Sequence, residues 1–262
     1  RQVAGSIGAR QNEVVFLSGG TEANNLAIRG LCEASTEEAG HIITSAIEHP
    51  SVRGVCDALE KRGGEVTRLP VSDNGIVRAE DAREALRPNT SLITVMFANN
   101  EIGTLQPIRE LGELVRELRD AGRHHLWLHT DAVQAAGRVL LDVEELGVDL
   151  MSLSGHKMYA PKGVGALFVR RGVRLQSQAL GGHQERDRRG GTDNVPGIVA
   201  FGEAAQLAKV ELSKRSTHDK LLRDRFEAEV LKRIDDVVVN GELDKRLDHL
   251  SNLSFRFIEG EG

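Results

Sequence analysis

The sequence predicts an α/β fold, in which a mostly parallel central sheet with flanking helices is followed by part of a smaller α+β domain. Two observations lead to this prediction. Short apolar runs alternate with amphipathic helical stretches up to about residue 195, which favours parallel strands joined by helices. One long helical run then replaces the alternation. We therefore predict a large domain over residues 1–205, and a linking helix with a partial small domain over residues 206–262.

The predicted strands of the large domain are short apolar segments, as is typical of buried strands. They lie at Glu13–Leu17, His41–Ile47, Glu65–Val71, Ser91–Ala98, Leu126–Asp131, Leu150–Ser154 and Gly165–Arg170. Helical spacing predicts the intervening helices at Thr21–Leu31, Val52–Lys61, Ala79–Leu86 and Ile108–Asp120. In the last of these, leucine and valine side chains share one face.

The C-terminal quarter has a different pattern of apolar and polar residues. A helical run extends from Pro196 to about Ile234, with an expected break near Ser213–Thr217, and strands are predicted at Val237–Asn240 and Leu250–Ile258. A helix and two strands bury too little surface to form a complete domain. We therefore expect that the sequence is an excerpt of a longer chain, also because it begins with Arg1 rather than Met.

Composition narrows the class of protein. The net charge is −5 with a pI near 6.0, and the basic residues form no stripe, so we expect no nucleic-acid partner. There is no uninterrupted apolar run of membrane-spanning length and no apolar signal core, which indicates a soluble, cytoplasmic protein without a membrane partner. Cys32 and Cys56 lack metal-ligand spacing, so we expect two inert thiols in a reducing compartment and no metal site.

Three segments carry candidate chemistry. The segment Ser18–Asn25 (SGGTEANN) follows a strand and opens a helix, where backbone N–H groups can bind a phosphate. The alternative is a plain tight turn with Thr21 as the N-cap. Since the sequence contains neither G-x-G-x-x-G nor G-x-x-x-x-G-K-[ST], a dinucleotide or a nucleoside triphosphate is not favoured.

The other two segments end neighbouring strands. Asp131 ends one predicted strand, and Lys157 follows the next, after Ser154, Gly155 and His156. Asp131 could merely cap the following helix, and lysines are usually solvated. At the carboxyl edge of a sheet, however, a lysine can form a Schiff base with an aldehyde cofactor, and a carboxylate can pair with a pyridinium nitrogen. Together with a phosphate loop, these are the three contacts that pyridoxal 5'-phosphate (PLP) needs.

The motifs SGGTEANN, EHPSV, NNEIG, HTDAVQ, SGHKMYAPKG and GGTDN resemble, in order, those of the cysteine desulfurases, and the resemblance extends over Arg1–Gly262. This family has the large domain of fold-type I PLP-dependent transferases and belongs with the class-V aminotransferases. The resemblance implies that Lys157 holds PLP as a covalent aldimine, that Asp131 meets the pyridine nitrogen, and that His49 stacks on the ring. Catalytic roles are thereby implied for Lys157 and His49.

The resemblance also implies the remaining contacts with the cofactor. Gln134 would meet the ring hydroxyl, and Asn100 would make a second polar contact. The implied phosphate contacts are Gly20, Thr21, Ser154 and His156, with Thr192 supplied by the neighbouring subunit of a homodimer. Each residue has a simpler alternative role: His49 could order a turn, Asn100 could cap a segment, and Gln134 and His156 could satisfy backbone groups.

The implied activity converts L-cysteine to L-alanine and leaves a persulfide on an enzyme cysteine. That sulfur then passes to an acceptor protein, for iron–sulfur cluster assembly or thiolation. Relatives of this kind carry the nucleophilic cysteine, and an arginine for the substrate carboxylate, beyond the Glu259–Glu261 stretch. Since the sequence stops at Gly262, we expect the 262-residue chain alone to have no turnover.

Two further departures from the family pattern are visible. The N-terminal segment that helps to build the family's small domain is missing, and Gly190 stands where many relatives have serine. Two other functions remain open at this point. One is a selenocysteine lyase or another fold-type I PLP enzyme, which would share the cofactor residues. The other is a non-catalytic partner in a sulfur-transfer assembly.

Overall fold

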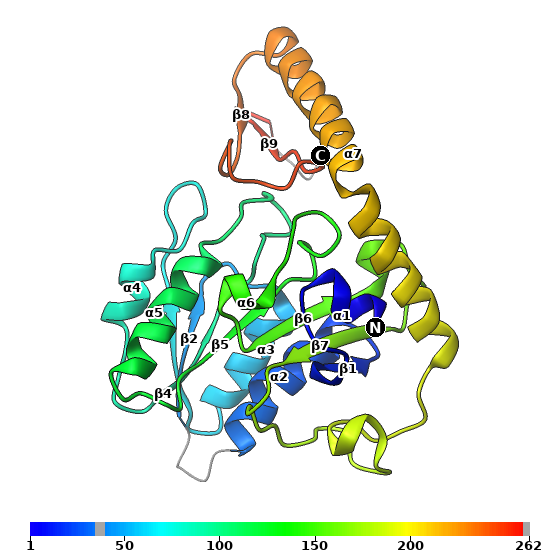
Figure 1. Ribbon diagram of the computed structural model, residues 1–262. Coiled ribbons are helices and arrows are strands. Elements are labelled where there is room, and N and C mark those ends of the chain that lie inside the picture. The colour runs from blue at the N-terminus through cyan, green and yellow to red at the C-terminus, as the bar shows by residue number, and fades with distance from the viewer. Residues whose placement is uncertain (35–39, 259–262) are drawn as a thin grey trace.

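The central element of the computed structural model, which describes residues 1–34 and 40–258, is a seven-stranded sheet (Figure 1). The strand order is β1-β7-β6-β5-β4-β2-β3. The strands span Val14–Leu17 (β1), His41–Ser45 (β2), Glu65–Leu69 (β3), Thr90–Thr94 (β4), Trp127–Asp131 (β5), Leu150–Ser154 (β6) and Gly165–Val169 (β7). Strands β2 to β6 are parallel, and β7 runs antiparallel to both of its neighbours. This confirms the predicted mostly parallel sheet and all seven of its strands.

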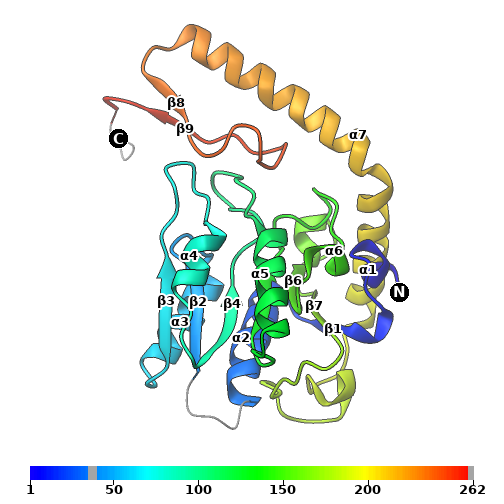
Figure 2. The same ribbon diagram turned by 60° about the vertical axis from the view of Figure 1, so that its left-hand side comes forward.

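Helices cover both faces of the sheet (Figure 2). Helices α2 (Gly20–Ala34) and α3 (Pro50–Glu60) pack on one face, where they enclose one of the two apolar clusters. The other face carries α4 (Ala79–Glu84), α5 (Ile108–Asp120) and α6 (Val143–Leu146), together with α1 (Gln2–Ser6) and the start of α7 (Val195–Arg233). Because both faces are covered, the inner strands β2, β6 and β7 are buried along their whole length instead of being exposed at alternate residues.

The sequence did not predict the short helices α1 and α6, nor the side-chain contacts at one edge of the sheet. Helices α1 and α6 have five and four residues, too few to show a helical period in the sequence. At the edge strand β1, side chains bond to two backbone groups of the strand. The Phe16 N–H donates to Glu185 Oε2 over 2.9 Å, and Arg186 Nη2 donates to the Val14 carbonyl over 2.7 Å. These contacts protect the edge from pairing with another strand.

Helix α7 has 39 residues and no break, so the break expected near Ser213–Thr217 was wrong. Serine and threonine are only moderate helix formers, and neither glycine nor proline lies in this segment to interrupt the backbone. The Thr217 hydroxyl donates to the Ser213 carbonyl over 2.9 Å, so it bonds within the helix instead of competing with it. The predicted boundary at 205/206 falls inside this continuous helix.

The C-terminal region returns from α7 as a hairpin of β8 (Val237–Val239) and β9 (Leu253–Phe255), which pair antiparallel. Strand β9 is shorter than the predicted Leu250–Ile258. Between the two strands, Leu247 inserts fully into the large core, and the backbone of residues 245–247 bonds to that of residues 103–105. In the described part of the chain, no helix is long and apolar enough to cross a membrane.

Candidate active site

The carboxyl ends of β5 and β6 lie side by side in the sheet, since Asp131 pairs in register with Ser152. Asp131 is the last residue of β5. Lys157 lies in a short 3-10 helix, η2 (Gly155–Met158), directly after β6. Two neighbouring parallel strands therefore carry the predicted carboxylate and the predicted lysine to the same edge. Ligands of open α/β sheets bind at this edge.

Asp131 is a buried carboxyl group that accepts hydrogen bonds from uncharged donors. Its Oδ1 accepts from the Val133 N–H over 3.0 Å, and its Oδ2 accepts from Asn24 Nδ2 over 2.7 Å. Burial raises the pKa of Asp131 above its usual value, although both hydrogen bonds oppose this effect. Within residues 1–34 and 40–258, no lysine or arginine forms a salt bridge with it. A bound cation such as a pyridinium would therefore stabilise its charge.

Lys157 and His156 are both exposed, whereas Ser154 is fully buried at the end of β6. The Ser154 hydroxyl lies 2.8 Å from His156 Nδ1, so two of the predicted phosphate contacts are bonded to each other. Partial burial lowers the pKa of His156, and the charges of Lys157 and Lys162 lower it further. His156 is therefore a neutral hydrogen-bonding group near neutral pH.

The predicted phosphate loop packs against these strand ends. A Cβ atom at Gly20 would lie 2.6 Å from Val133 Cγ2 and 3.5 Å from Ser154 Cβ, so a side chain there would displace Val133. Helix α2 begins at Gly20, which places Thr21 inside the first turn instead of at the N-cap. The first N–H groups of a helix lack intrahelical acceptors. They can bind a phosphate at this end of the sheet.

His49 and Asn100 lie in turns that follow strands β2 and β4. The exposed His49 is the N-cap of α3, because its Nδ1 accepts from the Ser51 N–H over 3.1 Å. It thus has the turn-ordering role considered above, and its ring is also accessible. Asn99, not Asn100, caps the turn after β4, since its Oδ1 accepts from Glu101 and Ile102. Asn100 and Gln134 are both half-buried.

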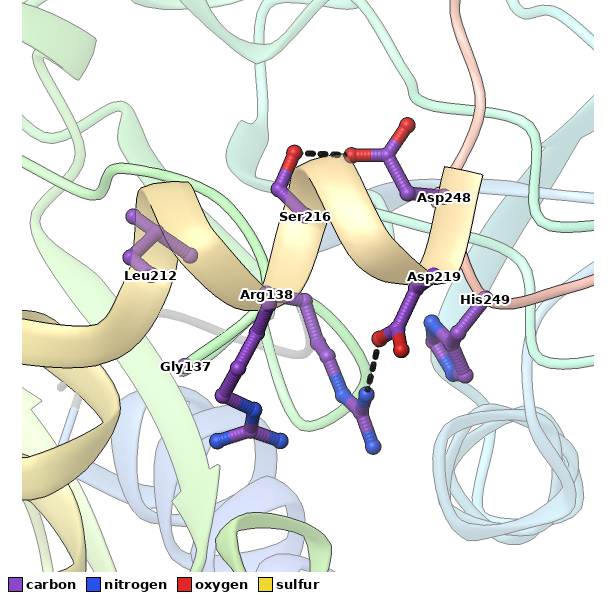
Figure 3. Close-up of a pocket in the computed structure, with 8 residues that line it drawn as sticks. Gly137, Arg138, Leu212, Ser216, Asp219, Asp248 and His249 are labelled. Atoms are coloured by element: carbon purple, nitrogen blue, oxygen red, sulfur yellow. Dashed lines mark hydrogen bonds and ion pairs between the residues drawn. The ribbon is translucent and has the colours of Figure 1, made fainter. Parts of the chain in front are cut away.

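Thr192 is exposed on the loop between β7 and α7. It lines a shallow hollow together with Ser18, Gly163 and Asn194, next to the start of the phosphate loop. A second hollow lies between α7 and the loop after β5, where Arg138 bonds to Asp219 over 3.4 Å and Ser216 to Asp248 over 2.5 Å (Figure 3). This second hollow contains none of the predicted site residues.

Cys56 is buried and Cys32 is half-buried, as expected for inert thiols. Burial raises the pKa of Cys32 to about 11 and that of Cys56 to about 12. Near neutral pH both remain thiols, which are poor nucleophiles. His129, next to Asp131, is likewise a core residue. Its ring nitrogens bond to Thr94 and Ser152, and burial lowers its pKa to about 3.

Three residues around the site were not identified from the sequence: Asn24, Ser51 and Glu48. Asn24 is completely buried and contacts Asp131, while Ser51 joins Asn24 to His49. Glu48 is buried beside the site, and burial raises its pKa to about 8. For Asn24 a signal was available: it lies one turn after Gly20, on the face of α2 that also presents Ala27 and Leu31. A polar residue on an apolar face usually has a specific partner.

Solved structures with similar architecture define the class of this fold. A NifS-like protein superposes with a TM-score of 0.93 at 33% identity, over 99% of this chain and 70% of that one. DndA from Streptomyces lividans superposes with a TM-score of 0.90 at 38% identity, over 99% and 72%. The fold is therefore that of the fold-type I PLP-dependent transferases, as predicted.

Comparison of sequences identifies the family. The chain belongs to the aminotransferase class-V family, whose model matches residues 1–261. The cysteine desulfurase IscS of Dictyoglomus turgidum is 47% identical over 99% of this chain, and that of Methanosarcina thermophila is 48% identical over 100%. The chain spans 64% and 63% of the length of these two curated relatives. The resemblance in the motifs is confirmed.

Proposed function

We propose that this chain is the cofactor-binding part of a cysteine desulfurase, with L-cysteine as substrate, PLP held by Lys157, and a sulfur-acceptor protein as partner. The observation that carries the proposal is the placement of a buried carboxyl, without a salt bridge among the described residues, at the end of β5, beside a lysine that follows the end of β6. The names of the relatives support cysteine as the substrate.

The residues present fit the cofactor. Asp131 would hold the positive charge at the ring nitrogen, and His49 would lie on the ring face. The proposed phosphate contacts are the N-terminal turn of α2 at Gly20 and Thr21, the Ser154–His156 pair, and Thr192 from a second subunit of a homodimer. Gln134 and Asn100 would contact the polar substituents of the ring. We retain residues 1–205 as the cofactor-binding domain and 206–262 as part of a second domain, and we propose that the protein is cytoplasmic.

When bound, PLP supplies an electron sink for the electrons left at the substrate Cα after deprotonation. The chain's own residues prepare this step. Lys157 would hold the cofactor, and its Nζ would take the proton from the substrate Cα. Asp131 supplies negative charge from a buried position, where an ion pair is weakened little by water. Since their raised pKa values keep Cys32 and Cys56 as thiols near neutral pH, the proposed sulfur transfer requires another cysteine.

The test is chemical mapping of the lysine. The protein is incubated with PLP and reduced with borohydride, and its peptides are analysed by mass spectrometry. We expect the phosphopyridoxyl mass on Lys157, whereas the exposed Lys162 of the same loop serves as the internal control. Labelling of both lysines to the same extent, or of neither, would contradict the proposal.

A second test addresses Asp131. Asp131→Asn keeps the shape of the side chain but removes its charge, so a bound pyridinium would lose its counterion. Loss of one partner of a buried ion pair costs roughly 3–5 kcal/mol, and we expect PLP to dissociate during gel filtration of the variant. Full retention of PLP would show that Asp131 does not meet the ring nitrogen.

A further inference from the structure

A chain of hydrogen bonds connects the buried carboxyl of Asp131 with the exposed ring of His49. Asn24 Nδ2 donates to Asp131 Oδ2 over 2.7 Å and to Ser51 Oγ over 2.8 Å. Ser51 Oγ lies 2.7 Å from His49 Nδ1. The links come from α2, the first turn of α3, and the end of β5. Three elements distant in sequence thus meet at one amide group.

The direction of each bond follows from the chemistry of its partners. An ionised carboxylate only accepts hydrogen bonds, so the group of Asn24 that faces Asp131 must be its NH₂. The second hydrogen of this NH₂ points to Ser51 Oγ, which leaves the Ser51 hydroxyl hydrogen for His49 Nδ1. The Ser51 backbone N–H donates to the same nitrogen over 3.1 Å. His49 Nδ1 is therefore an acceptor, and the neutral ring carries its hydrogen on Nε2.

The burial of Asn24 indicates that this chain of bonds has a role beyond the stability of the core. Asn24 has no exposed surface, and its Oδ1 is buried without a partner in the described part of the chain. A buried polar group with one unsatisfied atom is unfavourable compared with an apolar residue of similar size. Core stability alone would favour leucine or methionine here, on a face otherwise formed by Ala23, Ala27 and Leu31.

We propose that Asn24 and Ser51 are positioning residues, which together fix the orientation of the Asp131 carboxylate and the tautomer of His49. This inference rests on the proposed function, since it assigns both residues a role toward bound PLP. Neither residue needs to touch the cofactor. Asn24 acts through Asp131, and Ser51 acts through His49.

The experiment measures PLP binding to the cofactor-free protein and the pH titration of the absorption of the bound cofactor. Asn24→Ala removes a donor to a charged group, and we expect PLP binding to weaken by roughly tenfold or more. Hydrogen bonding to the ionised form lowers the pKa of a carboxyl group, so its loss weakens pairing with the ring nitrogen. The midpoint of the absorption titration should therefore shift from that of the unsubstituted protein.

Ser51→Ala should weaken PLP binding by roughly two- to tenfold, because it removes a neutral hydrogen bond. Ser51→Thr keeps the hydroxyl and should restore the binding and the titration midpoint of the unsubstituted protein. The effects of Asn24→Ala and Ser51→Ala should not add in the double variant, since the two residues share one bond. The control is Arg29→Ala, farther along the same helix, whose Nη2 donates to Glu33 Oε1, and it should leave PLP binding unchanged.

Two results would overturn the inference. One is wild-type PLP affinity with an unchanged titration midpoint in both Asn24→Ala and Ser51→Ala. The other is a failure of Ser51→Thr to restore binding that Ser51→Ala has lost. If Asn24→Ala does not fold, as judged by its thermal transition without cofactor, the two Ser51 variants decide. If the unsubstituted protein binds no PLP, the proposed function fails first and the inference fails with it.

Discussion

The central sheet and the C-terminal region are stabilised in different ways. The sheet packs apolar clusters on both faces, with Phe168, Ile43 and Leu92 fully buried. The C-terminal region leaves large apolar side chains exposed, among them Leu221 and Phe226 on α7. Besides the buried Leu247, it contains a buried ion pair, in which Arg246 donates to both carboxylate oxygens of Glu227 over 2.7 and 2.6 Å. The sheet is therefore stabilised mainly by hydrophobic burial, whereas the C-terminal region combines a few buried apolar contacts with a buried ion pair.

The largest predicted difference between the two regions is in how much the free energy of unfolding falls when a phenylalanine is replaced with alanine. Phe168→Ala opens a cavity in the sheet core and should lower the free energy of unfolding by about 3–5 kcal/mol. Phe257, which is 92% exposed, is the matched control, and Phe257→Ala should change it by less than about 0.5 kcal/mol. Urea titration followed by circular dichroism gives both values. Similar losses for the two variants would show that Phe257 is also buried in solution.

Breaking the ion pair should affect the C-terminal region alone. Arg246→Ala leaves the buried Glu227 carboxylate without its partner, at a cost of roughly 3 kcal/mol to the attachment of this region. We expect faster amide hydrogen exchange in β8 and β9, with unchanged exchange in β4 to β6. Replacing both partners with methionine should restore slow exchange. Faster exchange across the whole sheet in Arg246→Ala would mean that the two regions unfold together.

The two regions should also differ in their response to pH. In the large domain, burial raises the pKa of Glu48 to about 8, whereas an unfolded glutamate titrates near 4.5. The folded state therefore keeps a proton that the unfolded state loses, so this residue's contribution to stability is complete below pH 4.5 and declines as the pH rises to about 8. Glu48→Gln should flatten the dependence of the melting temperature on pH over this range, unlike the control Glu110→Gln at an exposed position.

Glu227 should respond in the opposite direction. Desolvation alone would raise its pKa, but the hydrogen bonds and the charge of Arg246 outweigh it, so the pKa is lowered. Its contribution to stability is therefore present above pH 4.5 and is lost as the pH falls below that value. As the pH falls, the protection of the β8 and β9 amides, relative to their intrinsic exchange rates at each pH, should decrease before that of the sheet amides. A simultaneous decrease in both regions would contradict this assignment.

The smallest predicted effect concerns the unbroken helix. Thr217 is exposed in the middle of α7, and Thr217→Ala replaces a moderate helix former with the best one. We expect the helix to become more stable by no more than about 0.7 kcal/mol, seen as a slight rise in melting temperature. A decrease would indicate that the Thr217 hydroxyl bond to Ser213 contributes more than helix propensity does.

The sequence by itself determined the class of fold, the seven strands, and the family. Short apolar runs separated by amphipathic helices have few other solutions, and the motifs containing Asp131 and Lys157 are long and specific. The strand ends that carry these two residues were also predictable, because parallel strands present their carboxyl ends at one edge. Whether these side chains bind PLP remains a prediction.

Tertiary structure alone decided the contacts around those side chains. Asn24, Ser51 and Asp131 meet although they are up to 107 positions apart, and no local pattern encodes such a contact. The helix break that local residue preferences predicted at Ser213–Thr217 was also wrong. Continuous helical hydrogen bonding there overrides the weak tendency of these residues to interrupt a helix. Sequence periodicity reports which face of an element is buried, whereas the partner of a buried polar group depends on how the elements pack.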